Sequence, residues 1–148
     1  MKKLSAAILL SSFAFASSAF AGTTTTAVAV QLADGYNAIG AATDTTLNVP
    51  RAYALAPVAA RAGFVKSAFE AVLSANVIAG LVDSGSTNRM SVIAGSNKGY
   101  NVFTGSSVGG SVAQCGQPVA KTVTNLGASL VVTGSVSLTT DNACNRAL

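Results

Sequence analysis

The stretch SVIAGSNKGYNVFTGSSVGGSVAQCG, residues Ser91–Gly116, alternates short apolar runs with small and turn-forming residues. The segments SNKG, GSS and CGQP within and just after this stretch carry the residues that turns require. Between these turns the apolar period is about two, which predicts short strands at Met90–Ala94, Tyr100–Thr104 and Val108–Gln114. Strands that follow one another through such short turns predict an antiparallel sheet.

The same stretch contains one G-x-S-x-G match, Gly105–Gly109, with Ser107 at its centre. A nucleophile elbow needs this motif at a strand-to-helix turn, together with a histidine that takes the serine proton. The residues after Gly109 are predicted as strand, and the chain contains no histidine. The spacing Gly105–Gly110 also lacks the Lys and Ser/Thr that complete a phosphate-binding loop. We therefore interpret the glycines as turn and bulge positions.

The composition favours a protein that is not an enzyme. The chain has five carboxylates, no spacing of which suggests a catalytic pair, and it has no tryptophan. Without histidine, zinc and copper lose their commonest ligand, and no calcium-loop motif is present. We expect no catalytic residue, no metal and no cofactor. Scattered basic residues argue against a nucleic-acid partner.

The first 21 residues, MKKLSAAILLSSFAFASSAFA, have the three parts of a secretory signal peptide. Lys2 and Lys3 precede an apolar run, and Ala19-Phe20-Ala21 forms an A-x-A ending. The leader predicts cleavage between Ala21 and Gly22, and Sec-type export to the periplasm, the cell surface or the medium. No uninterrupted apolar stretch reaches the ~18 residues that suggest a membrane helix, so we expect no retained one. The mature domain would span 22–148 as a single unit.

Charged residues are scarce, at 9% of the chain. Without Lys2 and Lys3 the mature chain keeps seven basic residues (nine minus two) against five acidic ones. Charge normally keeps soluble domains apart, so a surface rich in Ser, Thr and Ala tolerates close self-contact. Such a surface suits an extracellular assembly, although a small neutral secreted domain can also carry one.

Cys115 and Cys144 are the only cysteines. In an oxidising compartment they predict one disulfide, because a redox pair is usually C-x-x-C and a metal site brings more ligands. Closing this loop would stabilise the domain by roughly 3 kcal/mol.

The N-terminal part of the mature chain alternates and predicts a strand at Thr23–Leu32, with Val28, Val30 and Leu32 on one side. Residues Ala33–Pro50 carry turn residues and are predicted as loop with at most one short strand. From Pro57 towards Gly80 and Gly85, apolar residues recur at three- and four-residue intervals and predict an amphipathic helix. That stripe comprises Val58, Ala62, Val65, Phe69, Val72 and Leu73.

Two further strands are predicted, at Val119–Thr124 and within ASLVVTGSVSLTT, residues 128–140. In the second, Leu130, Val132, Val136 and Leu138 alternate with hydroxyl residues. The sequence therefore predicts an α+β fold: one central amphipathic helix packed on an antiparallel β-sheet and closed by the Cys115–Cys144 disulfide.

Two classes of function follow. The first is a cell-surface or fibre subunit of the pilus or adhesion type, acting by self-association, with Val28, Val30 and Leu32 as a segment that adds as a strand to a neighbour. The alternative for Val28, Val30 and Leu32 is a first strand in their own sheet. The second class is a small monomeric periplasmic or secreted binding module or inhibitor that uses the turns Ser96–Gly99 and Gly105–Gly110.

The Cys115–Cys144 loop, which ends four residues before Leu148 and follows the predicted helix, resembles the disulfide-bounded loop of type IV pilins. The chain lacks their long apolar N-terminal helix and has an A-x-A leader instead. The leader and the alternating segment Thr23–Leu32 resemble those of donor-strand pilins, whose sequence order places no long helix in the middle. Both resemblances imply a subunit of a surface fibre.

Overall fold

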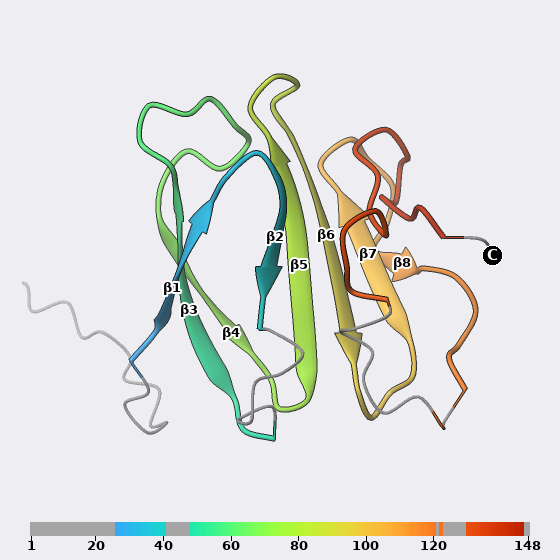
Figure 1. Ribbon diagram of the computed structural model, residues 1–148. Coiled ribbons are helices and arrows are strands. Elements are labelled where there is room, and N and C mark those ends of the chain that lie inside the picture. The colour runs from blue at the N-terminus through green and yellow to red at the C-terminus, as the bar shows by residue number, and fades with distance from the viewer. Residues whose placement is uncertain (1–25, 41–47, 121, 123–129, 147–148) are drawn as a thin grey trace, which may run out of the picture.

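Eight strands and no helix make up the part of the chain that the computed structural model describes, which comprises residues 26–40, 48–120, 122 and 130–146 (Figure 1). Sheet A has three strands in the order β1 (Val28–Leu32), β3 (Arg51–Pro57) and β4 (Phe69–Leu73). Sheet B has five strands in the order β2 (Gly35–Ile39), β5 (Val77–Ser84), β6 (Arg89–Ser96), β7 (Val102–Ser106) and β8 (Ala113–Gln114).

Two of the passages of the chain between the sheets are short. Residues 33 and 34 join β1 to β2, and a turn at 74–76, with Asn76 at a φ of 63°, joins β4 to β5. The β1 strand runs parallel to β3, whereas all other pairs in both sheets are antiparallel. The antiparallel arrangement predicted from Ser91–Gly116 is therefore confirmed for β6 and β7. The predicted strand Val108–Gln114 is wrong over most of its length: residues 108–110 form a bend, where Gly109 and Gly110 have φ values of 145° and 77°, and only Ala113–Gln114 pair with β7 as the short β8.

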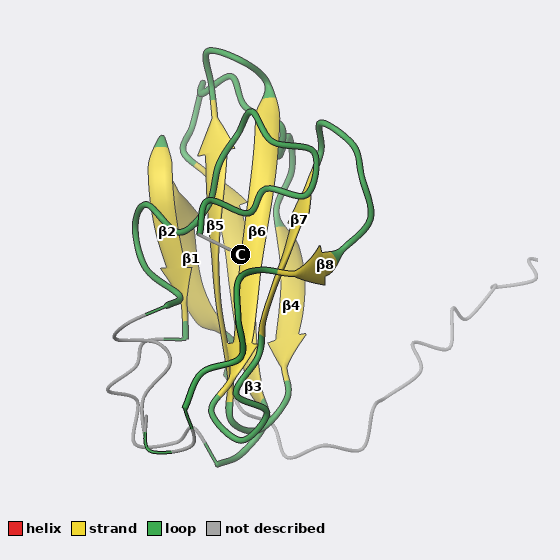
Figure 2. Ribbon diagram, turned by 90° about the vertical axis from the view of Figure 1, so that its right-hand side faces the viewer, coloured by secondary structure: helices red, strands yellow, loops and turns green. Residues whose placement is uncertain are grey.

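The two faces of sheet B pack against different parts of the chain. One face meets sheet A in a core of buried apolar side chains from both sheets and from the connection 58–68, namely Leu32, Ile39, Tyr53, Leu55, Val65 and Leu81. The other face presents Ile78, Ile93 and Val102, and Val131 of the C-terminal segment packs on them. Figure 2 shows this segment, residues 130–146, lying in front of sheet B without joining it as a strand.

The predicted central helix is wrong. Pro57 ends β3 instead of opening a helix, residues 58–68 form an irregular connection, and β4 and β5 occupy the rest of the region. Of the predicted stripe, Val65 is buried, while Val58, Phe69 and Val72 are exposed. The described fold is all-β, and the α+β class is corrected accordingly.

The physical reason lies in how β5 is packed. Ile78 faces the C-terminal segment and Leu81 faces sheet A, so both faces of this strand are buried. A strand buried on both sides reads as a continuous apolar run, which periodicity cannot separate from a buried helix. The β4 strand made the region look more helical. Its residues Phe69, Val72 and Leu73 fall at helical intervals from Val58, Ala62 and Val65 of the preceding connection.

The predicted strand within 128–140 is also wrong over its described residues. Residues 130–135 form bends and turns, with Gly134 at a φ of 87°, and only an isolated bridge joins Val136 to Cys144. The segment covers sheet B through Val131, which is buried, rather than through Val132. Hydrogen bonds from Tyr36 to the Val131 carbonyl and from Ser91 to the Ser137 carbonyl hold it in place.

The other strand predictions fare unevenly. Thr23–Leu32 contains β1, and the short strand allowed within Ala33–Pro50 is β2. The described residues of Val119–Thr124, which are 119, 120 and 122, form no strand. The remaining residues of that prediction, like the leader, lie outside the described part of the chain.

The predicted disulfide is confirmed. Cys115 and Cys144 are bonded with an S–S distance of 1.99 Å and a sequence separation of 29 residues. The bond ties the end of the C-terminal segment to the residue that follows β8. Arg146 adds a hydrogen bond of 2.6 Å from Nη1 to the Cys115 carbonyl.

Candidate functional site

The inner face of sheet B is only partly covered by sheet A. In the β-ladder, Leu81 pairs with Val92 and Ala79 with Ala94, so Val92 and Ala94 lie on the face that contacts sheet A. Phe103 continues this row, because it pairs with Ala94 across β6 and β7. Leu81 is 2% exposed, but Val92 is 37% and Phe103 is 46% exposed. Coverage by sheet A therefore ends between β5 and β7.

A second row of apolar groups lies beside the first. Val92 pairs with Gly105, and a Cβ on Gly105 would come within 3.1 Å of Val112 and 3.6 Å of Val92. The two valines thus flank the glycine, and Val112 is 72% exposed. Val92, Ala94, Phe103 and Val112, with Gly105 between them, are called the flank below. The glycine keeps this surface flat enough for another chain to approach.

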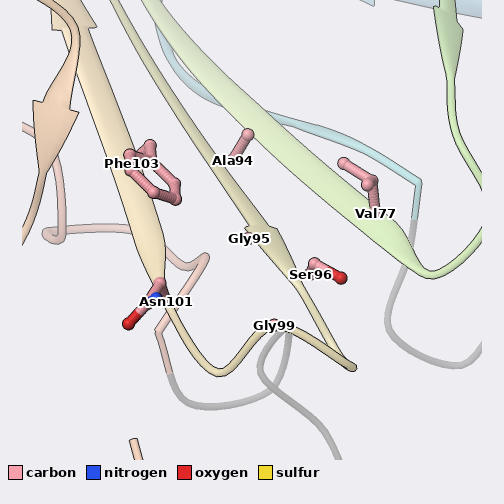
Figure 3. A pocket seen from close by; sticks show the side chains of 7 residues that line it. All are labelled: Val77, Ala94, Gly95, Ser96, Gly99, Asn101 and Phe103. Atoms are coloured by element: carbon pink, nitrogen blue, oxygen red, sulfur yellow. The ribbon is translucent and has the colours of Figure 1, made fainter. Parts of the chain in front are cut away.

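One end of the flank is hollowed. A pocket of ≈ 200 Å³ is lined by Val77, Ala94 and Phe103, together with Ser96 and Asn101. Figure 3 shows the side chains of Val77, Ala94 and Phe103 in a row across β5, β6 and β7. The Asn101 Oδ1 atom is buried and has no hydrogen-bond partner among the residues that the structure describes. The pocket is large enough to hold one apolar side chain.

The flank carries no charge. The only charged residue between Met90 and Gln114 is Lys98, which lies in the turn between β6 and β7. An apolar surface without charge suits a partner that is also uncharged, because a charged group brought against it would lose its hydration without gaining a counter-ion.

The edge strand β4 borders the same opening from sheet A. Phe69 pairs with Leu55 across β3 and β4, so it shares the inward side of sheet A with that core residue, yet it is 42% exposed. Val72 on the opposite side of β4 is 70% exposed. Figure 2 places β4 on the side of the molecule where β7 and β8 form the edge of sheet B. Among the described strands β4 pairs only with β3, so its outer edge is open.

Charged side chains gather at the far end of β5. Asp83 is fully buried, accepts hydrogen bonds from the backbone N–H groups of Phe64 at 2.7 Å and Val65 at 3.3 Å, and pairs with Arg61 at 3.0 Å. Arg61 also donates to the carbonyl of Asp83 and bonds Asp34 at 3.0 Å. This cluster pins the 58–68 connection onto sheet B, and we interpret it as structural.

Asp34 belongs to the same cluster but lies on the surface. The backbone N–H of Gly85, which donates to Oδ1 at 2.7 Å, and the Arg61 guanidinium lower the pKa of Asp34. Both favour the charged carboxylate.

Of the sites predicted from the sequence, the structure describes the strand-exchange segment and the disulfide but not the cleavage site. Val28, Val30 and Leu32, the predicted strand-exchange segment, lie in β1 and pair with β3 of the same chain, where Leu32 is fully buried and Val28 is 54% exposed. The predicted cleavage site at Ala21 and Gly22 lies outside the described residues. Ser107 lies at the end of the β6–β7 ladder, where its Oγ accepts the N–H of Met90 at 2.8 Å.

Sequence reasoning missed the flank. The available signal was that Val92, Ala94 and Phe103, which lie in two of the predicted strands, are all apolar. Alternation could not show which of the two faces remained uncovered, because both faces of β6 carry apolar residues.

No family model, curated protein or solved structure matches the chain. Among the described residues, no helix has the length and apolar character needed to span a membrane. The same residues bring together no group of three or more His, Cys, Asp and Glu side chains that could bind a metal.

Proposed function

We propose that the chain is an exported structural protein that acts by self-association at the bacterial cell surface, as a subunit of a fibre or adhesive coat. The observation that carries the proposal is the flank: an uncharged apolar surface, with Phe103 46% and Val112 72% exposed, beside the open edge of β4. Exposed apolar patches of this kind on soluble proteins mark interaction sites.

Export is supported by the leader Met1–Ala21 and by the Cys115–Cys144 disulfide, which is stable in an oxidising compartment. We place the mature protein at the cell surface, in the medium or in the periplasm. A non-enzymatic role remains part of the proposal, because association needs only the surface and no reacting group.

Self-association also agrees with the scarcity of charge. An open strand edge usually carries charged residues that prevent pairing with other chains. On β4 only Glu70 is charged, while Phe69 and Val72 expose apolar surface. The edge is therefore weakly protected against a further strand.

The experiment is the association state of the mature chain, Gly22–Leu148, measured by sedimentation velocity and negative-stain electron microscopy over a hundredfold range of concentration. Oligomers or filaments that grow with concentration are expected. A monomer throughout this range would reject the proposal.

The pocket beside Phe103 favours one second candidate, a monomeric module that binds a small apolar ligand. Its volume of ≈ 200 Å³ is at the small end for a ligand site and is largely open to one side of the sheet. A monomer that binds an apolar fluorescent probe, and loses this binding in Phe103→Lys, would favour the second candidate.

A further inference from the structure

The proposed function leaves open which surfaces meet, and the inference below rests on it. We propose that residues Gly22–Ala27, called the arm, of one copy add as a strand along the open edge of β4 in a second copy, over the flank. The arm precedes β1 directly in the chain.

The acceptor is built from β4 and the flank together. Phe69, Ala71 and Leu73 lie on the inward side of β4, because they pair with Leu55, Tyr53 and Arg51 of β3. A strand beside β4 would continue sheet A by about 4.8 Å on the side where sheet B is uncovered. Its own inward side chains would then shield Val92, Ala94 and Phe103 from water.

The arm fits this acceptor in length and chemistry. It has the sequence GTTTTA, six residues, against the five residues of β4. Threonine favours strands, and in an extended segment alternate threonines point to opposite sides. The threonines and Ala27 that face the flank would present methyl groups, while the others present hydroxyls to water. The arm contains no charged side chain, which matches the uncharged flank.

The arm of the same copy cannot reach the acceptor productively. It leaves from β1, and β3 lies between β1 and β4 in sheet A. The site beyond β4 is three strand spacings away from β1, roughly 14 Å. Six extended residues span at most about 20 Å, so crossing the sheet would leave too few of them to pair along β4. The donor is therefore a second copy.

This arrangement also determines the kind of assembly. The donor segment and the acceptor edge are different surfaces of the same chain, so each contact is heterologous and leaves one free arm and one free edge. Repetition produces a ring or an open filament rather than a closed two-fold dimer. In each junction β1 remains in its own sheet, with Leu32 still in the core.

The test uses four variants of the mature chain. Thr25→Pro removes a backbone N–H from the arm and disfavours a strand there. Phe103→Lys places a charge in the flank, and Val112→Lys is a second flank variant should the first fail to fold. Val58→Lys changes a residue that is 37% exposed outside the flank and serves as the matched control. Far-UV circular dichroism and urea unfolding verify folding of each variant.

Sedimentation velocity gives the concentration at which half of the protein is associated. We expect Thr25→Pro and Phe103→Lys each to raise this concentration roughly tenfold or more, and Val58→Lys to leave it unchanged. An equimolar mixture of Thr25→Pro and Phe103→Lys should form dimers only, since one intact arm and one intact acceptor remain for a single junction. Hydrogen exchange of the β4 amides should slow in the associated state.

The outcomes separate the two proposals. A wild-type chain that stays monomeric overturns both. A wild-type chain that associates while Thr25→Pro and the flank variants associate equally well overturns the arm-to-β4 contact and leaves the proposed function standing. A mixture of the two variants that remains monomeric, or extends into filaments, also overturns it.

Discussion

The ring of Tyr36 occupies the space that a side chain on Gly80 would need. A Cβ built on Gly80 would overlap the Tyr36 hydroxyl and the adjoining ring carbon. From this position Tyr36 donates a hydrogen bond of 2.7 Å to the Val131 carbonyl. Tyr36 lies on β2 and Gly80 on the neighbouring β5. Because Gly80 has no side chain, the Tyr36 ring can lie across β5 and hold the C-terminal segment against sheet B.

Gly80→Ala should therefore destabilise the protein. The added methyl must displace Tyr36, which costs about 1–3 kcal/mol in a packed site. Urea unfolding followed by circular dichroism measures the change. Gly99→Ala is the matched control, because its Cβ would meet nothing closer than 3.4 Å. Equal effects of the two substitutions would contradict the steric role of Gly80.

Tyr36 should also make stability depend on alkaline pH. Burial raises the pKa of Tyr36 to about 12, compared with an ordinary value near 10. The folded protein then holds this proton more tightly than the unfolded chain, so the contribution is fully present below pH 10 and is lost as pH rises through about 12. The free energy of unfolding of the wild type should fall more steeply over this window than that of Tyr36→Phe. Parallel slopes would refute the assignment.

Removal of the disulfide should weaken the whole domain. The double substitution Cys115→Ala with Cys144→Ala opens a loop of 29 residues, with an expected loss of roughly 3 kcal/mol. Release of the C-terminal segment would also expose Ile78, Ile93 and Val102. Increased binding of an apolar dye, together with a lower urea midpoint, checks both effects. The oxidised wild type and the wild type with reductant serve as references.

Asp83→Asn should be strongly destabilising. The carboxylate is fully buried, and its removal leaves Arg61, whose side chain is 9% exposed, without a buried counter-charge. Breaking such a pair from one side costs about 3–5 kcal/mol. The free energy of unfolding at neutral pH measures this loss. An effect no larger than that of Asp34→Asn, whose side chain is 70% exposed, would show that the cluster contributes little.

The Asp34 carboxylate should account for part of the loss of stability at acidic pH. Its pKa is lowered by the Gly85 N–H and by Arg61. A lowered folded pKa gives stability that is present above the unfolded value near 3.8 and is lost as pH falls through the folded value. Unfolding free energies measured between pH 5 and pH 2 should therefore decline less steeply in Asp34→Asn than in the wild type. Identical slopes would exclude this contribution.

Local alternation and turn chemistry were sufficient to predict several elements. β6 and β7 follow from the apolar pairs and turns of Ser91–Gly116, and β1 from the alternation up to Leu32. The disulfide follows from the presence of two cysteines and from the predicted leader, which suggests an oxidising compartment. In these cases the residues that decide the structure lie close together in the sequence or, as with the two cysteines, have no alternative partner.

The prediction of a central helix was wrong because long-range strand pairing, not local propensity, decides the structure of this region. Residues 57–85 contain β4 and β5, which pair with β3, β2 and β6. No local sequence pattern in this region predicts those pairings. The strand predicted in the C-terminal segment was wrong because its local pattern suggested a strand that no pairing supports. It alternates like a strand, but Gly134 turns the chain and Val131 packs on Ile78 and Ile93 without a ladder.

The sequence by itself determined the pairing of the two cysteines, the scarcity of charged residues and the approximate positions of β1, β6 and β7. Only the tertiary structure decided that β5 is a strand, which face of β6 and β7 is covered, and that Phe103 and the edge of β4 are left open. Burial depends on which distant segments meet, and local periodicity carries no information about that choice.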